Sequence, residues 1–176
     1  MKVFITGVAG TGKSTIAKAL TERGITTVDF SDYPALRYWR NKITKKKSDY
    51  SPNNDMSWFD DHECVCDLDE LKKLFVQHEN LVITGVATGT EALGFFDKII
   101  LLQSSPETIR QRMETRNRVF GKKKEEQDSV IAWRDEFDPM ILSHEAIPIS
   151  TEGALEEVVE KILTEISKID GRVVSG

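Results

Sequence analysis

The sequence predicts an α/β protein of three layers, in which a five-stranded parallel sheet lies between two layers of helices. Five short apolar runs recur along the 176 residues, and amphipathic segments separate most of them. A glycine-rich stretch directly follows the first apolar run, as in strand–loop–helix units of parallel sheets. Because 39% of the residues are hydrophobic, the chain can build one core, and we expect a single domain over residues 1–176.

The glycine-rich stretch Gly7–Ser14 fits the phosphate-binding pattern G-x-x-x-x-G-K-[ST]. An apolar run at 2–6 precedes it and an amphipathic helix at 15–23 follows it, which is the context this loop requires. The motif predicts that Lys13 reaches the β- and γ-phosphates of a nucleoside triphosphate and that the Ser14 hydroxyl ligates Mg²⁺. The fold class is therefore a three-layer P-loop NTPase fold. We expect nucleotide contacts from Gly10, Thr11, Gly12, Lys13, Ser14 and Thr15.

The second strand is predicted at 25–30, where β-branched residues are frequent. Asp29 and Asp32 lie at its end, and the carboxyl ends of parallel strands are where ligands bind. Pro34 is suited to a first helical turn, so we expect a helix to open over residues 35–40. A polar, lysine-rich segment at 41–57 follows and is expected to be mobile.

The rest of the chain repeats the alternation of strands and helices. Apolar runs predict strands at 81–84, 98–102 and 146–149. Helices are expected at 67–77, from Ser105 onward, at 129–143 and at 154–169. Pro139 is expected to bend or interrupt its helix, and Pro148 favours an edge position for the last strand. Gly171 should end the last helix, and polarity rises over 116–128, a second segment expected to be mobile.

Net charge and composition limit the kinds of partner and the location that we expect. The net charge of −5 argues against a general nucleic-acid binder. No apolar run approaches the roughly 20 residues that span a bilayer. The first strand begins at residue 2 and leaves no room for a leader segment, so a cytoplasmic location is expected. The two cysteines, Cys64 and Cys66, lack the further ligands of a zinc site and are expected to be reduced thiols.

Three features resemble the small P-loop kinases, such as adenylate kinase and shikimate kinase. The phosphate-binding loop lies within the first fifteen residues, the chain is short, and an arginine-rich helix follows the fourth strand. The segment 117–124 is similar to R-x-N-x-x-G-K runs of small kinases of this class. The resemblance implies a strand order of 2-3-1-4-5 and phosphoryl transfer from ATP-Mg²⁺ to a small acceptor, a nucleoside, a nucleotide or a related metabolite. It also implies a lid at about 117–127 and an acceptor-side insert at about 34–78.

The same resemblance implies roles for individual side chains. Arg112 and Arg116 would contact the nucleotide, one stacking on the adenine and the other approaching the phosphates, and a solvated helix face is the alternative. Arg116 would join Lys13 in catalysis, and Arg118 and Lys122 would close over the triphosphate. The acceptor pocket would be framed by Asp32, Arg37, Arg40 and the segment through Trp58.

We expect Asp29 to serve the metal and Asp32 to engage the acceptor hydroxyl as orienter or general base. The alternative for Asp32 is that it caps the helix expected after Pro34. The third strand ends Thr84-Gly85 and lacks the carboxylate that many kinases of this class carry there, and the Gly-aromatic-Pro-Arg run of adenylate kinases is missing. A P-loop NTPase that acts as an ATP-dependent switch on a macromolecular partner is therefore the second functional hypothesis. The acceptor and the oligomeric state stay open at this point.

Overall fold

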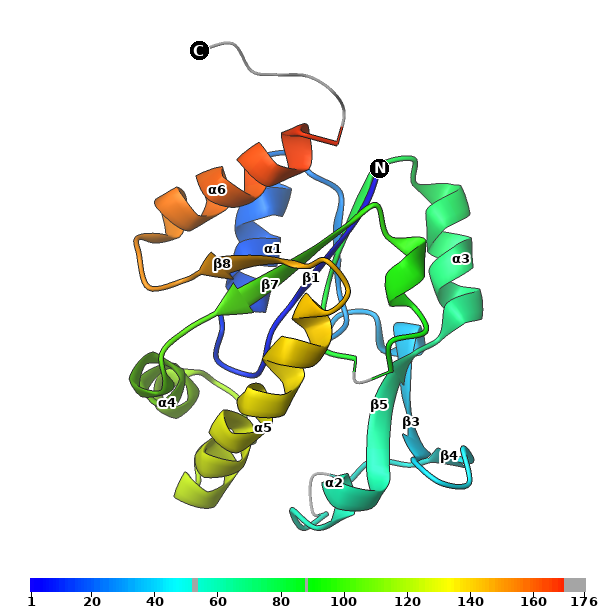
Figure 1. Ribbon diagram of the computed structural model, residues 1–176, viewed down its shortest axis with the longest axis vertical. Helices are drawn as coiled ribbons and strands as arrows, with labels where there is room; N and C mark the ends of the chain where they lie inside the picture. Colours follow the sequence, from blue (N-terminus) through cyan, green and yellow to red (C-terminus); the bar gives the residue numbers. More distant parts are fainter. Residues whose placement is uncertain (52–53, 88, 170–176) are drawn as a thin grey trace.

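The computed structural model describes residues 1–51, 54–87 and 89–169. Five strands form a sheet in which every pair of neighbours is parallel (Figure 1). They are β1 (Lys2–Thr6), β2 (Thr27–Asp29), β6 (Leu81–Thr84), β7 (Lys98–Gln103) and β8 (Ile147–Ser150). Their order is β2-β6-β1-β7-β8, which is 2-3-1-4-5 counted along the chain and confirms the expected topology. Pro148 lies on the edge strand β8, where its missing N–H interrupts no ladder.

Helices cover both faces of the sheet and build two hydrophobic clusters. On one face, α1 (Lys13–Glu22) and α6 (Leu155–Ser167) pack against inward residues such as Ile5 and Ile100. On the other face, α3 (Leu68–Gln77), α4 (Pro106–Thr115) and α5 (Lys124–Leu142) pack against Phe4, Leu101 and their neighbours. Because both faces are covered, the central strands β6 and β7 are mostly apolar and buried, as the sequence indicated.

The prediction of a helix at 35–40 is wrong. A single 3₁₀ turn, η1 (Pro34–Leu36), leads into β3 (Arg37–Asn41), which pairs antiparallel with β5 (His62–Cys66). A short β4 (Lys47–Ser48) completes a second, three-stranded sheet, and α2 (Trp58–Asp61) lies before β5. The aromatic residues of β3 prefer a pleated surface, and Trp39 packs there against other rings instead of lying on a helix face. We call residues 37–51 and 54–66 the insert; it projects at the lower right of Figure 1.

Two further expectations change in detail. The helix α5 begins at Lys124 instead of residue 129, because the Glu126 carboxylate accepts from the backbone N–H of Lys123 and caps the helix start. It also continues without interruption through Pro139, which lies close enough to the carboxyl end that few backbone bonds depend on it.

A short 3₁₀ turn, η2 (Leu93–Phe95), precedes β7. Pro52, Asn53 and Gly171 lie outside the described residues.

All the loops that follow the carboxyl ends of the parallel strands meet at one edge of the sheet. The loop after β1 is the phosphate-binding loop, and those after β2, β6, β7 and β8 bring Ser31, Gly85, Ser104 and Thr151 to the same side. Within the residues that the structure describes, no helix is long and apolar enough to cross a membrane.

Candidate active site

The phosphate-binding loop has the backbone that its glycines permit. Gly7, Gly10 and Gly12 have φ angles of 148°, 88° and 94°, in the range that residues with a Cβ rarely adopt. At Gly7 a Cβ would also lie 2.5 Å from the carbonyl oxygen of Leu102, so a side chain there would push the loop off β7. The hydroxyl of Thr11 donates to the carbonyl of Val8 at 2.8 Å and closes the turn from within. The loop is therefore shaped before any ligand arrives.

Lys13 lies across this loop. Its Nζ donates to the carbonyls of Gly7 and Val8 at 2.6 and 2.9 Å. Burial lowers the pKa of Lys13 from 10.5 to about 7, with Arg116 and Arg118 adding to the shift and Asp29 opposing it. An anion bound in the loop would reverse this balance, because it favours the charged ammonium.

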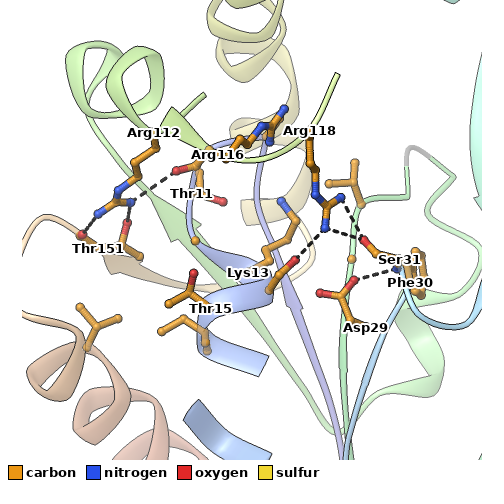
Figure 2. A pocket seen from close by; sticks show the side chains of 18 of the residues that line it. Thr11, Lys13, Thr15, Asp29, Phe30, Ser31, Arg112, Arg116, Arg118 and Thr151 are labelled. Carbon is orange, nitrogen blue, oxygen red and sulfur yellow. Dashed lines mark hydrogen bonds between the residues drawn. The ribbon is translucent and has the colours of Figure 1, made fainter. Parts of the chain in front are cut away.

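The loop opens into a cavity of about 590 Å³ (Figure 2). Of the described residues that line it, five carry a positive charge and one carries a carboxylate, Asp29. The cations are Lys13, Arg37, Arg112, Arg116 and Arg118. Such a surplus suits a ligand with several negative charges, and the triphosphate of a nucleotide is such a ligand.

Asp29 lies at the end of β2 beside the phosphate-binding loop. Its carboxylate accepts from the Ser31 N–H at 2.7 Å and from the Thr84 hydroxyl at 3.0 Å. Burial alone would raise the pKa of Asp29, but these bonds and those from the Ser14 and Ser31 hydroxyls lower it, so the group is ionised. A carboxylate and the Ser14 hydroxyl thus lie together, a pair of hard oxygen ligands of the kind that Mg²⁺ takes.

Thr84 and Ser31 support Asp29 in the candidate site, and the sequence analysis did not single them out. Asp29 and Thr84 are paired in register on neighbouring strands, so the hydroxyl that ends the third parallel strand supports a carboxylate from the second. For Thr84 the register of two strands far apart in the chain was the signal, and it is visible once the strand order is known. For Ser31 the signal was local, since it lies two residues after Asp29.

Arg112 is half-buried and fixed by several oxygens. Its Nη1 donates to the hydroxyls of Thr151 at 2.9 Å and Ser104 at 3.1 Å, and lies 3.4 Å from the Gly10 carbonyl. Its Nη2 donates to the Thr151 carbonyl at 2.6 Å. The side chain therefore joins α4 to the ends of β7 and β8, and it is not part of a solvated helix face.

Arg116 lines the cavity from the end of α4. Its Nη2 donates to the Phe120 carbonyl at 2.8 Å, while its buried Nε has no partner within the part of the chain that the structure describes. Burial and the nearby Arg118 lower the pKa of Arg116, and Glu126 opposes them. A buried, unsatisfied N–H is costly, and an oxygen of a bound ligand would satisfy it.

The segment between α4 and α5 is fixed at Gly121 to the first turn of α5. Gly121 has φ 97°, its N–H donates to Glu126 at 2.7 Å, and its carbonyl accepts from Gln127 at 3.0 Å. Arg118 reaches across the cavity, with Nη2 3.4 Å from the Ser14 hydroxyl and 3.2 Å from the Ser31 hydroxyl. Lys122 instead donates to the carbonyls of Glu114 and Arg116, where it caps α4.

On the acceptor side, the structure brings in some expected residues and leaves others out. Arg37 lines the cavity, together with Phe30, Gly85, Val86 and Phe120. Arg40 does not line it, because its guanidinium pairs with Glu63 at 2.8 Å and Glu91 at 2.6 Å. Trp58 stacks on His62 with ring centroids 4.1 Å apart, within the insert.

Asp32 is exposed and is not among the residues that line the cavity. The capping alternative also finds no support, since the 3₁₀ turn after it has Tyr33 as its N-cap and no side-chain cap bond. The role of Asp32 at the acceptor stays a prediction.

The geometry defines a class first: a P-loop α/β protein with a preformed cavity for a polyanion. Comparison of sequences then gives the family. The AAA domain family matches residues 3–132, and the chain belongs to it. This is compatible with the resemblance to small P-loop kinases.

A protein that is similar in sequence supports the same class. Over 118 residues, 66% of this chain, the sequence is 31% identical to a protein named "Putative adenylate kinase" from Methanocaldococcus jannaschii. The match spans 59% of that relative's length.

Solved structures share the fold. A shikimate kinase from Acinetobacter baumannii, in complex with shikimate, superposes with a TM-score of 0.61 at 20% identity, covering 95% of this chain and 93% of that one. A deoxyadenosine kinase from M. mycoides gives a TM-score of 0.55 at 17% identity, covering 96% and 100%. At these identities the likeness is one of fold.

Proposed function

We propose that this chain is a phosphotransferase that moves the γ-phosphoryl group of ATP-Mg²⁺ to a small acceptor, a nucleoside, a nucleotide or a related metabolite. The observation that carries the proposal is the cavity, in which Lys13 lies between two differently lined ends (Figure 2). One end is formed by Arg112 and the segment after β8, and the other by Asp29, Phe30 and Arg37. A transfer enzyme needs a donor site and an acceptor site on opposite sides of the transferring group.

The donor half of the site is proposed to hold the nucleotide through the backbone of the phosphate-binding loop. Successive N–H groups of the loop and the amino end of α1 favour the phosphates. Lys13 would turn from the Gly7 and Val8 carbonyls to the β- and γ-phosphates. The nucleotide-binding residues are Gly10, Thr11, Gly12, Lys13, Ser14, Thr15, Arg112 and Arg116.

Ser14 and Asp29 are the residues that would hold Mg²⁺, Asp29 through water or directly. Their oxygens lie together, and the carboxylate is ionised, so the donor set fits a hard divalent cation. When bound, the ion neutralises charge on the β- and γ-phosphates. The hydrogen bonds from Ser31 and Thr84 hold the carboxylate in one orientation.

Catalysis in this proposal is positioning and charge stabilisation. Lys13 and Arg116 would stabilise negative charge on the transferring group, and the buried Nε of Arg116 is a donor without a present partner among the described residues. Arg118 would exclude water from above, since it already spans the cavity. Asp32 is the remaining candidate for orienting the acceptor hydroxyl.

A coupled assay of ADP formation tests the proposal. The purified chain is screened with ATP-Mg²⁺ against nucleosides, nucleoside monophosphates and sugar acids, with the phosphorylated product identified by mass spectrometry. Acceptor-dependent turnover that vanishes in Lys13→Ala supports the phosphotransferase. ATP hydrolysis that only a protein or nucleic acid stimulates, with no phosphorylated small molecule, would favour the switch.

A further inference from the structure

The end of the cavity that lies away from the acceptor side is built from α4 and the segment after β8. Figure 2 shows Arg112 and Thr151 on one side of Lys13, and Asp29, Phe30 and Ser31 on the other. Because the phosphates lie at Lys13, the base of the donor nucleotide extends toward Arg112. The residues that line this end are Thr115, Gly153, Leu155 and Val158, in addition to Arg112 and Thr151.

The polar edge of Arg112 is committed to the protein. Both terminal nitrogens donate to Thr151, and Nη1 donates to Ser104 as well. These bonds lie in the plane of the guanidinium, so what Arg112 offers a ligand at this end is its flat face. A guanidinium face stacks on an aromatic ring whichever ring it is.

The neighbouring polar side chains are also committed. The Thr115 hydroxyl donates to the Gln111 carbonyl at 2.9 Å. The Glu152 carboxylate accepts from the Ser105 N–H at 2.6 Å and the Thr108 hydroxyl at 2.7 Å, at the start of α4. The carbonyl of Thr151 accepts from Arg112.

The remaining walls are apolar or lack a side chain. Leu155 and Val158 come from the first turns of α6, and Gly153 contributes backbone alone. The bonds of Arg112 and Glu152 fix the segment 151–153 to α4, so the position of this wall is set by the protein itself. The side chains of this slot are suited to the face of a base more than to its hydrogen-bonding edge.

We infer that the donor site reads the triphosphate and the flatness of the base but not the identity of the base, so that ATP, GTP, CTP and UTP are all bound and used. That all four are bound rests on the slot alone, whereas that all four are used rests on the proposed function. Stacking tolerates every base, because each has a π-face. A site built to hydrogen-bond a ligand edge instead rejects the wrong ligand by about 10⁴-fold or more.

Binding of the four triphosphates is measured by calorimetry with Mg²⁺ and without an acceptor. The expected result is four dissociation constants within about tenfold of one another. A spread wider than tenfold would overturn the inference, since it would require readout of the base edge. Because no turnover is involved, this result is independent of whether the chain transfers phosphate. An absence of acceptor-dependent turnover would count against the proposed function alone.

Inorganic tripolyphosphate serves as a ligand without a base and tests the role of Arg112. In Arg112→Lys, which keeps the charge but loses the planar face, all four nucleotides should bind about tenfold more weakly. Tripolyphosphate should bind within about threefold of its affinity for the unchanged protein. Equal weakening of tripolyphosphate and nucleotides would overturn the stacking role and assign Arg112 to the phosphates.

Arg110→Lys is the matched control. Arg110 lies on the same helix and pairs with Asp128 at 2.5 Å, outside the residues that line the cavity. Its substitution should leave all five affinities unchanged, which separates the stacking role from a general effect on α4. If Arg112→Lys lowers the melting temperature, Thr151→Val supplies a second variant, because it removes one acceptor that orients Arg112. It should weaken the four nucleotides equally and tripolyphosphate little, and a change in base preference would contradict the inference.

Discussion

The two ends of the cavity differ in what holds their side chains. At the donor end, Lys13 and Arg112 each donate to a backbone carbonyl that directly follows a strand of the five-stranded sheet, that of Gly7 after β1 and that of Thr151 after β8. At the acceptor end, Arg37 comes from the insert and is exposed, and its Nη1 lies 3.9 Å from the Cys64 sulfur. The donor end is preorganised, whereas the acceptor end depends on a small unit with its own packing.

The insert has a core made of rings. Trp39 lies 5.0 Å from Trp58, 5.4 Å from Phe59 and 5.5 Å from Tyr50, measured between centroids. Tyr50 is 41% exposed, and β4 is two residues long, so little apolar surface is removed from water there. Phe59 also lies 6.4 Å from Phe120 of the segment above the cavity. Low local stability is typical of elements that move on binding, and the comparison thus assigns rigidity to the donor end and adaptation to the acceptor end.

The largest expected effect is at Lys13. Lys13→Ala removes the charge that faces the β- and γ-phosphates, and we expect turnover to fall by about 10³-fold or more. The fold should survive, because Lys13 lies on a loop and not in either hydrophobic cluster. Lys18→Ala, on the outer face of α1 with 80% of its side chain exposed, is the control and should keep full activity. A folded Lys13→Ala protein with unchanged turnover would remove the donor end from the mechanism.

A smaller loss is expected at Asp29. Asp29→Asn removes the negative charge and leaves the size of the side chain, so turnover should fall by about 10²-fold and the Mg²⁺ concentration for half-maximal rate should rise. The Mg²⁺ titration is the deciding measurement, because a purely structural role would not change it. Asp69→Asn, exposed in the first turn of α3, should change neither quantity. Should Asp29→Asn need no more Mg²⁺ than the unchanged protein, the metal assignment is wrong.

The same contrast explains what could be predicted from sequence. The donor end follows from contiguous signals: one motif, one apolar strand before it and one amphipathic helix after it. The central parallel strands are mostly apolar runs because both faces are buried, so the sequence indicates their positions. Their order was implied by the resemblance to small P-loop kinases and is confirmed. The grouping of Lys13, Ser14 and Asp29 followed from the rule that carboxyl ends of parallel strands meet.

The insert could not be predicted for a physical reason. β3 reads Arg-Tyr-Trp-Arg-Asn and has no apolar face of its own until it pairs with β5, more than twenty residues later. Its stability is therefore non-local, and the proline before it suggested a helix instead. Arg40 was placed at the acceptor for its charge alone, but Glu63 and Glu91 neutralise it from distant positions in the chain.

Trp39→Ala tests whether the insert is a separate unit. Removing the ring at the centre of the cluster should lower hydrogen-exchange protection over β3 and β5, raise the acceptor KM by about tenfold, and leave nucleotide affinity unchanged. Trp133→Ala is the counterpart in α5, where the ring packs on Phe137 of the main core. It should lower the global melting temperature without a selective loss of protection in the insert. Uniform loss of protection in Trp39→Ala would mean that the two regions fold as one.

Lys13 should also make nucleotide binding at the donor end depend on pH. Because the pKa of Lys13 is about 7 in the free protein, the side chain is mostly neutral at pH 8, and bound phosphates should restore its charge. Nucleotide binding at pH 8 should therefore take up close to one proton, and affinity should fall about fivefold between pH 7 and pH 8. Calorimetry in buffers of different ionisation enthalpy measures the uptake. Lys13→Arg, charged throughout this range, should take up none, and equal uptake in both proteins would contradict the assignment to Lys13.

The smallest effect is expected at Asp32. Its place in the sequence and its place in the structure lead to opposite expectations for its role. Its place after β2 made it a candidate to engage the acceptor hydroxyl, and a general base there would cost about 10²-fold when replaced by an amide. Its exposed position, outside the residues that line the cavity, instead predicts a change of less than about threefold in kcat for Asp32→Asn. Asparagine keeps the size and removes the basicity, so kcat measured with a phosphorylatable acceptor distinguishes the two directly. A hundredfold loss with nucleotide affinity retained would show that the turn after β2 moves and brings Asp32 to the acceptor, and the acceptor end would then be as essential to the chemistry as the donor end. A loss below threefold would leave transfer to the donor-end groups, with the acceptor hydroxyl oriented by Asp29 or by the transferring phosphate itself.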